Sequence, residues 1–148
     1  MTDDEAAIRK VIARQFASLN WRPGTSGDWA AFTADFLPGA PLYAAARPVK
    51  AQTAEAFVER MKGVAGSKLR SFAEAVLGVE VQIFGNVAVA VAGCEITEND
   101  ADEMRGVEIC CWSKTRACGG SRLKPGIRRE TPNVFPPHFS RVKSEARK

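Results

Sequence analysis

The stretch Gly78-Val79-Glu80-Val81-Gln82-Ile83-Phe84-Gly85-Asn86-Val87-Ala88-Val89-Ala90-Val91-Ala92 carries the clearest structural signal in the chain. Apolar residues occupy every second position from Val79 to Ile83, which is the period of a half-buried β-strand. From Val87 to Ala92 valines alternate with alanines, which predicts a second strand. Gly85-Asn86 between the two runs is a typical two-residue hairpin turn. Asn99-Asp100 forms a second turn signal, and a third strand is expected from about Met104. Short connections make these strands antiparallel.

The residues before this region have helical spacing. Apolar positions between Ile8 and Leu19 recur every three or four residues, which predicts a helix from about Asp3 to Asn20. Thr2-Asp3-Asp4-Glu5 has the pattern of a capping box at its start. Asp28 and Thr53 are expected to cap a short second helix and a third helix. Helices followed by an antiparallel meander predict an α+β fold with the helices on one face of the sheet.

Length and composition describe one globular domain. The chain has 148 residues, of which 45% are hydrophobic and 26% are charged, unlike disordered chains and coiled coils. No apolar run approaches the roughly 20 residues that span a bilayer, so no membrane contact is expected. The acidic start Met1–Glu5 lacks the pattern of a secretory signal. We therefore expect a cytoplasmic protein without disulfides.

The net charge of +4 conceals two different compositions. Residues 1–112 contain 11 Lys and Arg and 15 Asp and Glu, a net charge of −4, whereas residues 113–148 contain 10 and 2, a net charge of +8. Four of the eight prolines also lie in the second part. We therefore predict an α+β domain over residues 1–112 and a basic, irregular tail over residues 113–148. Nucleic-acid binding by this tail would be nonspecific and salt-sensitive.

The order of these segments resembles the nuclear transport factor 2-like superfamily over about residues 5–107, and most closely its SnoaL-like and uncharacterised bacterial branches. The matching segments are, in chain order, Ala17-Ser18-Leu19-Asn20, Gly27-Asp28-Trp29-Ala30-Ala31-Phe32, Phe57-Val58-Glu59-Arg60-Met61 and Gly78–Ala90. The resemblance implies a strongly curved antiparallel sheet wrapped by about three N-terminal helices into a cone. It also implies a ligand pocket at the open end of the cone and a homodimer.

The C-terminal part departs from this resemblance. The last long strand of the family typically contains Lys-Asp-x-Gly-x-Trp-Arg-Ile, whereas this chain continues with Ser113–Gly120, Pro125-Gly126 and Pro136-Pro137. Proline and paired glycines do not suit a central strand. We therefore expect the last strand or strands to be absent or disturbed, which would leave an unpaired edge at Val87–Glu95 or its neighbour.

A change of reading frame near Val107–Ile109 would explain this departure. Codons built from the last base of one codon and the first two of the next permit Met-Leu-Leu-Val-Lys-Asp-x-Gly-Leu-Trp-Arg-Ile from Ile109 onwards, and Cys110-Cys111-Trp112 forces the two leucines. The alternative is that the tail is a genuine basic extension and that codon degeneracy makes the match accidental. The coding DNA distinguishes the two explanations.

The sequence contains no recognisable catalytic constellation, so the catalytic residues stay unknown at this stage. The single histidine, His138, is expected to be an incidental loop residue of the tail rather than a triad member. Cys110 and Cys111 are adjacent, and alternation along a strand sends neighbours to opposite faces. No metal site is therefore expected, and no cofactor. The tyrosine and carboxylates of a ketosteroid isomerase site are missing from the corresponding positions.

Four side chains are the candidates for binding a ligand in the cone: Trp29, Tyr43, Phe57 and Glu95. The three aromatic residues fit a pocket mouth, although ordinary core packing is the stronger explanation. Glu95 follows an apolar run on a strand that should line the cone, where a carboxylate binds a ligand or acts as a base. The alternative is that Glu95 faces solvent on the other side of the sheet.

The resemblance implies the binding of a small hydrophobic ligand in the cone. The alternative is a SnoaL-like or ketosteroid-isomerase-like enzyme acting on a small carbonyl or polyketide-like substrate. An acid–base pair converging in the cone would favour the enzyme, and a dry apolar cone would favour binding. The expected partners are a small molecule and, in the intact form of the family, a second copy of the chain, with no membrane and no specific nucleic acid.

Overall fold

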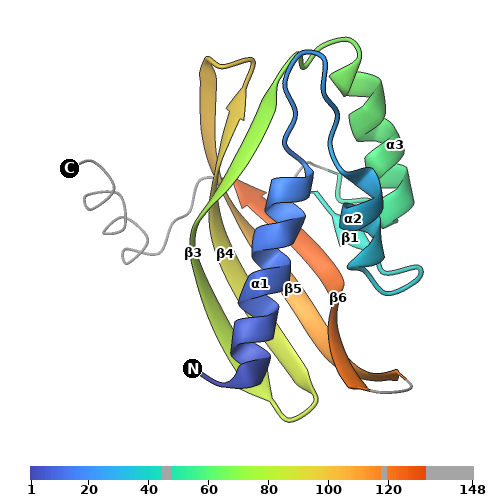
Figure 1. The fold of residues 1–148 in the computed structure, drawn as a ribbon, viewed down its shortest axis with the longest axis vertical. Helices are drawn as coiled ribbons and strands as arrows, with labels where there is room; N and C mark the ends of the chain where they lie inside the picture. Colours follow the sequence, from blue (N-terminus) through green and yellow to red (C-terminus); the bar gives the residue numbers. More distant parts are fainter. Residues whose placement is uncertain (45–47, 118–119, 133–148) are drawn as a thin grey trace, which may run out of the picture.

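Three helices precede most of the sheet along the chain. The computed structural model describes residues 1–44, 48–117 and 120–132. Helix α1 covers Asp3–Ser18, α2 covers Trp29–Ala34 and α3 covers Ala54–Ala65. All three lie on the same side of a curved sheet (Figure 1).

The helices begin at the predicted caps. The side-chain oxygens of Thr2, Asp28 and Thr53 each accept a hydrogen bond from the backbone amide three residues further on, at 3.1 to 3.2 Å. Only half of the expected capping box at α1 forms. The carboxylate of Glu5 turns instead to Arg9, which donates to it from Nη2 and Nε at 2.8 and 3.0 Å.

Within the described residues, six strands form one sheet in the order β2-β1-β6-β5-β4-β3. The strands are β1 (Leu42–Tyr43), β2 (Ala51–Gln52), β3 (Phe72–Phe84), β4 (Val87–Glu98), β5 (Asp102–Ala117) and β6 (Gly120–Pro132). Neighbours are antiparallel except β1 and β6, which run parallel. The turn between β4 and β5 is tight, because Asn99 and Asp100 both adopt positive φ.

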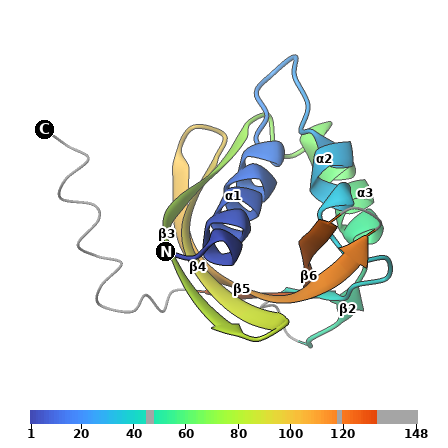
Figure 2. The same cartoon turned by 60° about the horizontal axis from the view of Figure 1, so that its bottom comes forward.

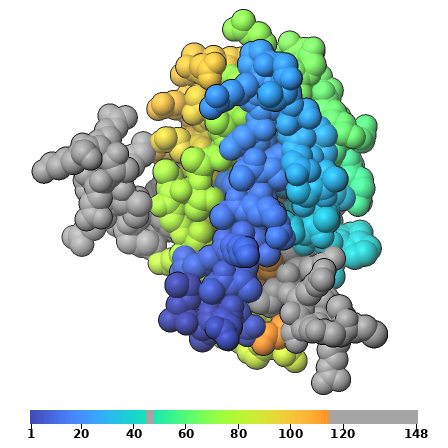
Figure 3. Space-filling model, viewed as in Figure 1, coloured from blue at the N-terminus to red at the C-terminus, as the bar shows by residue number. Residues whose placement is uncertain are grey.

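The sheet curls around α1, and α2 and α3 lie side by side next to it (Figure 2). On the surface, α1 runs along the middle of one face, with α2 on one side and the β3–β4 region on the other (Figure 3). This arrangement confirms the predicted fold class, an α+β fold with a curved antiparallel sheet and three N-terminal helices.

Small residues allow α1 to lie close to the sheet. Ala88, Ala90 and Ala92 on the inner face of β4 are at most 2% exposed. They share a buried cluster with three large α1 side chains, Ile8, Ile12 and Phe16. A second cluster lies around α2 and α3, where the ring of Phe32 is 5.2 Å from that of Phe57.

Strand β6 decides between the two expected outcomes, an absent or a disturbed last strand: the strand is present and carries a disturbance. β6 pairs with β5 along its length, and residues 113–117 continue β5. The register shifts once, between Cys111 and Trp112, opposite Pro125-Gly126. A bulge of this kind accommodates proline and glycine inside a strand, so the disturbance stays local. The division of the chain at residue 112 stays a prediction, but residues 113–117 and 120–132 are strand rather than irregular.

In the described residues the outer strands of the sheet are β2 and β3, and Val87–Glu95 on β4 is not an unpaired edge. Strand β4 pairs with β3 on one side and with β5 on the other, and β6 continues the meander beyond β5. The register between β3 and β4 shifts between Val76 and Gly78. A bulge at this position bends the edge strand and increases its twist.

Candidate functional site

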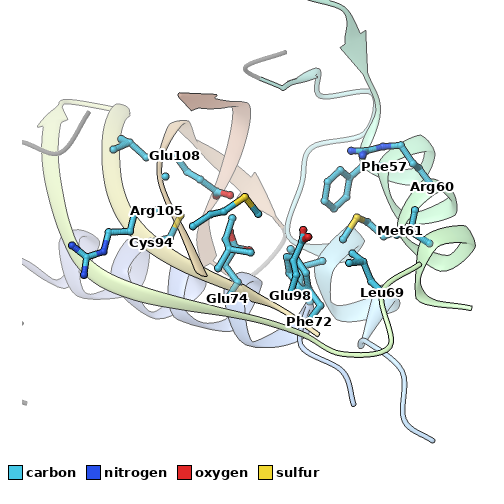
Figure 4. A pocket seen from close by; sticks show the side chains of 16 residues that line it. Phe57, Arg60, Met61, Leu69, Phe72, Glu74, Cys94, Glu98, Arg105 and Glu108 are labelled. Carbon is cyan, nitrogen blue, oxygen red and sulfur yellow. The ribbon is translucent and has the colours of Figure 1, made fainter. Parts of the chain in front are cut away.

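A cavity of about 370 Å³ lies between α3 and the inner face of strands β3, β4 and β5. Figure 4 shows the α3 side chains facing the strands across this space. The α3 side of the cavity, the adjoining loop and the start of β3 are largely apolar, with contributions from Phe57, Met61, Val64, Leu69 and Phe72. Ligand pockets occupy about 300 to 1,000 Å³, so the cavity fits a small molecule.

Three carboxylates line the strand side of the cavity. Glu74 comes from β3, Glu98 from β4 and Glu108 from β5, and their side chains lie around the same space in Figure 4. Glu74 is 5% exposed and Glu108 is 2% exposed, whereas Glu98 is half-buried. Charged groups so deep inside a protein are rare unless other groups stabilise them, and this concentration of acid distinguishes the cavity from an ordinary core gap.

Strand register brings these carboxylates to one wall. Glu74 lies opposite Ile96 on β4, and Ile96 lies opposite Met104 on β5. Residues that face each other across strands share a face of the sheet. Glu108 follows Met104 by four residues, so it returns to that same face.

Contacts from the end of α1 hold this wall in place. The backbone amide of Glu74 donates a hydrogen bond to Oδ1 of Asn20 at 2.8 Å. The ring of Trp21 stacks on Phe72 with 5.0 Å between ring centroids. Its Nε1 donates to the backbone oxygen of Leu69 at 3.1 Å. The acidic wall and the apolar loop are therefore fixed relative to one another.

An arginine stands at the outer part of the cavity. Arg60 is exposed, and its guanidinium carbon lies 5.2 Å from the centroid of the Phe57 ring, a cation–π distance. The depth of the cavity therefore carries buried carboxylates, while its solvent side carries a positive charge. Arg105 also borders the cavity, but its side chain points away from it (Figure 4).

The structure separates the four predicted ligand-binding residues. Phe57 lines the cavity. Trp29 packs against Trp21, with ring centroids 5.6 Å apart, and borders a separate open groove formed with α3. Tyr43 lies on β1 and is half-buried, and it is not among the described residues that line the cavity.

Glu95 lies on the outer face of the sheet. Its neighbours Cys94 and Ile96 line the cavity, so alternation along β4 turns Glu95 away. Its carboxylate accepts a hydrogen bond from Nε of Arg105 at 3.2 Å, directly across the strand pair. The solvent-side alternative from the sequence therefore describes its position.

Sequence reasoning missed Glu74 and Glu108. For Glu108 a signal existed, because it shares its strand face with Cys110 and Trp112, which are both buried. For Glu74 the signal was hidden, since the predicted strand began at Val79 and the bulge at Val76 and Gly78 interrupts the alternation.

The cysteines show no arrangement for chemistry in the described part of the chain. Cys94 and Cys110 are buried and Cys111 is half-buried. Burial raises the pKa of the Cys110 thiol to about 12, with a further contribution from Cys111, so a reactive thiolate is disfavoured. Across the described ranges, no group of three or more His, Cys, Asp and Glu residues is placed to hold a metal. His138 lies outside the described residues.

Comparison with solved structures identifies the architecture. A protein of unknown function from Pseudomonas putida KT2440, described as nuclear transport factor 2-like, superposes with a TM-score of 0.70 at 13% identity, covering 94% of this chain and 93% of its own. The chain has the nuclear transport factor 2-like fold. A second protein with this fold, also described as cystatin-like, comes from Novosphingobium aromaticivorans; it gives a TM-score of 0.70 at 14% identity and covers 95% of this chain and 88% of its own.

The nuclear transport factor 2-like fold is shared with a named enzyme. A hexachlorocyclohexane dehydrochlorinase from Novosphingobium barchaimii LL02 superposes with a TM-score of 0.69 at 9% identity, covering 90% of this chain and 88% of its own. At such identities the likeness concerns the fold and not the function. No protein-family profile and no curated protein matches the sequence. None of the helices in the described residues is long and apolar enough to cross a membrane.

Proposed function

We propose that this protein binds a small, largely apolar molecule in the cavity between α3 and strands β3 to β5. The observation that carries the proposal is the cavity itself, about 370 Å³ in volume and lined on its helical side by Phe57, Met61 and Val64. A folded core is normally packed without voids of this size, whereas ligand pockets commonly have this volume. Its few polar groups on an otherwise apolar lining are typical of a site that orients a ligand.

A variant that fills the cavity tests this proposal. Val64→Trp places a large side chain in the space, and a neutral fluorescent probe, N-phenyl-1-naphthylamine, reports its occupancy. We expect the Kd of the probe to rise by about tenfold or more, a loss of about 1.4 kcal/mol of binding free energy. Glu55→Trp, on the exposed side of α3, is the matched control. Equal binding by both variants and the parent protein would refute the proposal.

A second candidate function is proton transfer on a small carbonyl compound, and the two buried carboxylates favour it. Glu74 and Glu108 border one cavity from two strands. In such a reaction one carboxylate accepts a proton from the carbon next to the carbonyl group. The other, in its protonated form, donates a proton to the carbonyl oxygen, and the product is an enol. The reverse steps return both protons.

Exchange of hydrogen for deuterium tests this second function. In D₂O the enzyme would exchange the protons next to the carbonyl of 1-tetralone, a small bicyclic ketone, and NMR follows their loss. Glu108→Gln is expected to slow exchange by about 100-fold or more, while the exposed Glu103→Gln leaves the rate unchanged. Exchange at the buffer rate with the parent protein would leave ligand binding as the function.

Three further features complete the proposal. We propose a homodimer and a cytoplasmic location, both from the fold resemblance and the sequence. Sedimentation velocity measures the first, and fractionation of the source cells measures the second. The altered reading frame is part of the same proposal, since it accounts for a C-terminal sequence that differs from the rest in charge.

A further inference from the structure

We infer that the cavity takes a hydrophobic amine, an apolar body that carries a protonated nitrogen. The inference rests on the ligand-binding function proposed above and names the chemical class of the ligand. It is drawn from the distribution of charge around the cavity, which is acidic at depth and apolar along α3.

The deep wall favours a cation. Glu74 and Glu108 come from different strands, are almost fully buried and border the same space. Two carboxylates that border one low-dielectric cavity attract a positive charge much more strongly than they would in water. A carboxylate accepts hydrogen bonds at about four lone-pair positions, so one carboxylate can accept from a ligand nitrogen and from protein groups at the same time.

The same wall disfavours an anion. A ligand carboxylate or phosphate placed at this depth would face two or three acidic groups and lose its hydration. Arg105, the nearest basic residue on the strands, is engaged with Glu95 on the outer face at 3.2 Å. Arg60 is exposed at the rim, where water screens its charge, so it does not reverse the sign of the interior.

The helical side supplies the apolar contact. Phe57, Met61 and Leu69 face the carboxylates across the cavity (Figure 4). A molecule lying between these two surfaces would place its hydrocarbon part against α3 and its nitrogen toward Glu74 and Glu108. The ammonium N–H groups would donate charge-assisted hydrogen bonds to the carboxylates.

Three probes of the same shape and different charge test the inference. They are 2-phenylethylamine, 2-phenylethanol and phenylacetate, and calorimetry measures their affinities for the full chain. We expect the amine to bind about tenfold tighter than the alcohol, which is the difference between a charge-assisted and a neutral hydrogen bond. Phenylacetate is expected to bind more weakly than the alcohol. An acid that binds as tightly as the amine would overturn the inference.

Variants locate the preference in the cavity. Glu108→Gln and Glu74→Gln should each reduce the amine-to-alcohol ratio while keeping alcohol binding. Glu103→Gln, an exposed glutamate on the same strand as Glu108, is the matched control. A ratio that survives in the double variant contradicts the inference. If the double variant does not fold, a competition experiment with the parent protein replaces it. At about 0.5 M NaCl the pairing of the amine with surface carboxylates is screened. The inference then requires that 2-phenylethanol displaces 2-phenylethylamine competitively.

The same measurements separate the two proposals. Binding of the alcohol and the amine with equal affinity would leave the cavity as a ligand site and refute the amine class. No binding by any of the three probes, together with unchanged dye binding in Val64→Trp, would refute both.

Discussion

The guanidinium of Arg14 on α1 donates two hydrogen bonds to the carboxylate of Asp35, the residue that ends α2. Asp35 is buried while the Arg14 side chain is half exposed. Hydrogen bonding to Asp35 is the main reason that the pKa of Arg14 is raised. The pair therefore joins two helices that share only a short interface.

The two halves of this pair are expected to differ in their effect on stability. Arg14→Met leaves a buried carboxylate without its cation and should cost about 2–3 kcal/mol, somewhat less than a fully buried pair. Asp35→Asn leaves an arginine that water can solvate and should cost about 1 kcal/mol. Urea unfolding at neutral pH measures both, with the exposed Lys10→Met as control. Equal losses would show that burial of Asp35 is not the cause.

The small residues Ala88, Ala90 and Ala92 of β4 predict that a larger side chain under α1 lowers stability. Ala90→Leu adds three carbons under α1, where Ala90 is 1% exposed, and overpacking of this kind costs about 1–3 kcal/mol. Ala75→Leu makes the same change at an exposed position of β3 and should be nearly neutral. Thermal unfolding distinguishes them. A stable Ala90→Leu protein would mean that α1 does not pack closely on the sheet.

Two substitutions in the turn between β4 and β5 are expected to change stability in opposite directions. Asn99 accepts a hydrogen bond from the amide of Arg70 at 2.7 Å and donates one to the oxygen of Lys68 at 3.2 Å. Asn99→Ala loses both hydrogen bonds and places alanine at a positive φ, so it should lower the free energy of unfolding by about 1–3 kcal/mol. Asp100→Gly relieves its own positive φ of 59° and should stabilise by up to about 1 kcal/mol. Denaturant midpoints of the two variants should lie on either side of the parent.

Cys110 predicts how stability depends on pH. The folded state raises the pKa of this thiol from 9.0 to about 12, so above about pH 9 the unfolded chain loses a proton that the folded chain keeps. The contribution of the Cys110 thiol to the free energy of unfolding is complete below pH 9. It is lost as the pH rises toward 12, at up to about 1.4 kcal/mol per pH unit.

Comparison of two cysteine variants isolates this contribution. Cys110→Ala should flatten the decline in unfolding free energy between about pH 9 and about pH 11, whereas Cys111→Ala, on the other face of β5, should leave it in place. An unchanged slope in Cys110→Ala would assign the decline to other groups.

The reading-frame hypothesis makes a prediction about DNA. In the shifted frame, the codon that begins in Ile109 should encode the first residue of the missing strand. The codons after it should encode Leu-Leu-Val-Lys-Asp, without an early stop. Sequencing of the gene decides this directly. A stop codon or an unrelated reading would leave the basic C-terminal sequence as a genuine extension.

The local elements were predictable because their signals are short-range. Thr2, Asp28 and Thr53 identified the helix starts, since a cap is set by a residue and the amides that follow it. The alternation after Val79 identified the first hairpin in the same way. The last strand was expected to be absent or disturbed, because a local rule against proline does not decide whether a bulge, as at Pro125-Gly126, accommodates it.

The site was harder to predict because it depends on register. Whether Glu95 or Glu108 faces the cavity depends on which face of each strand lies inward, and a shift of one residue reverses that choice. Glu74 belongs to the part of β3 before the bulge, where the apolar period changes. Helical spacing places the side chain of Phe57 without reference to the sheet, so its position facing the interior could be predicted, while its role in binding stays a prediction.

The parallel contact between β1 and β6 has a consequence for the order of folding. Leu42 pairs with Arg128, whereas β3, β4 and β5 are joined by hairpins that need little chain to close. Closing a long loop costs more conformational entropy than closing a short one, and distant pairings slow folding. We expect the meander to form first and the pairing of β1 with β6 to form last. Pulse-labelled hydrogen exchange should then protect the amides of β3 and β4 before those of β1.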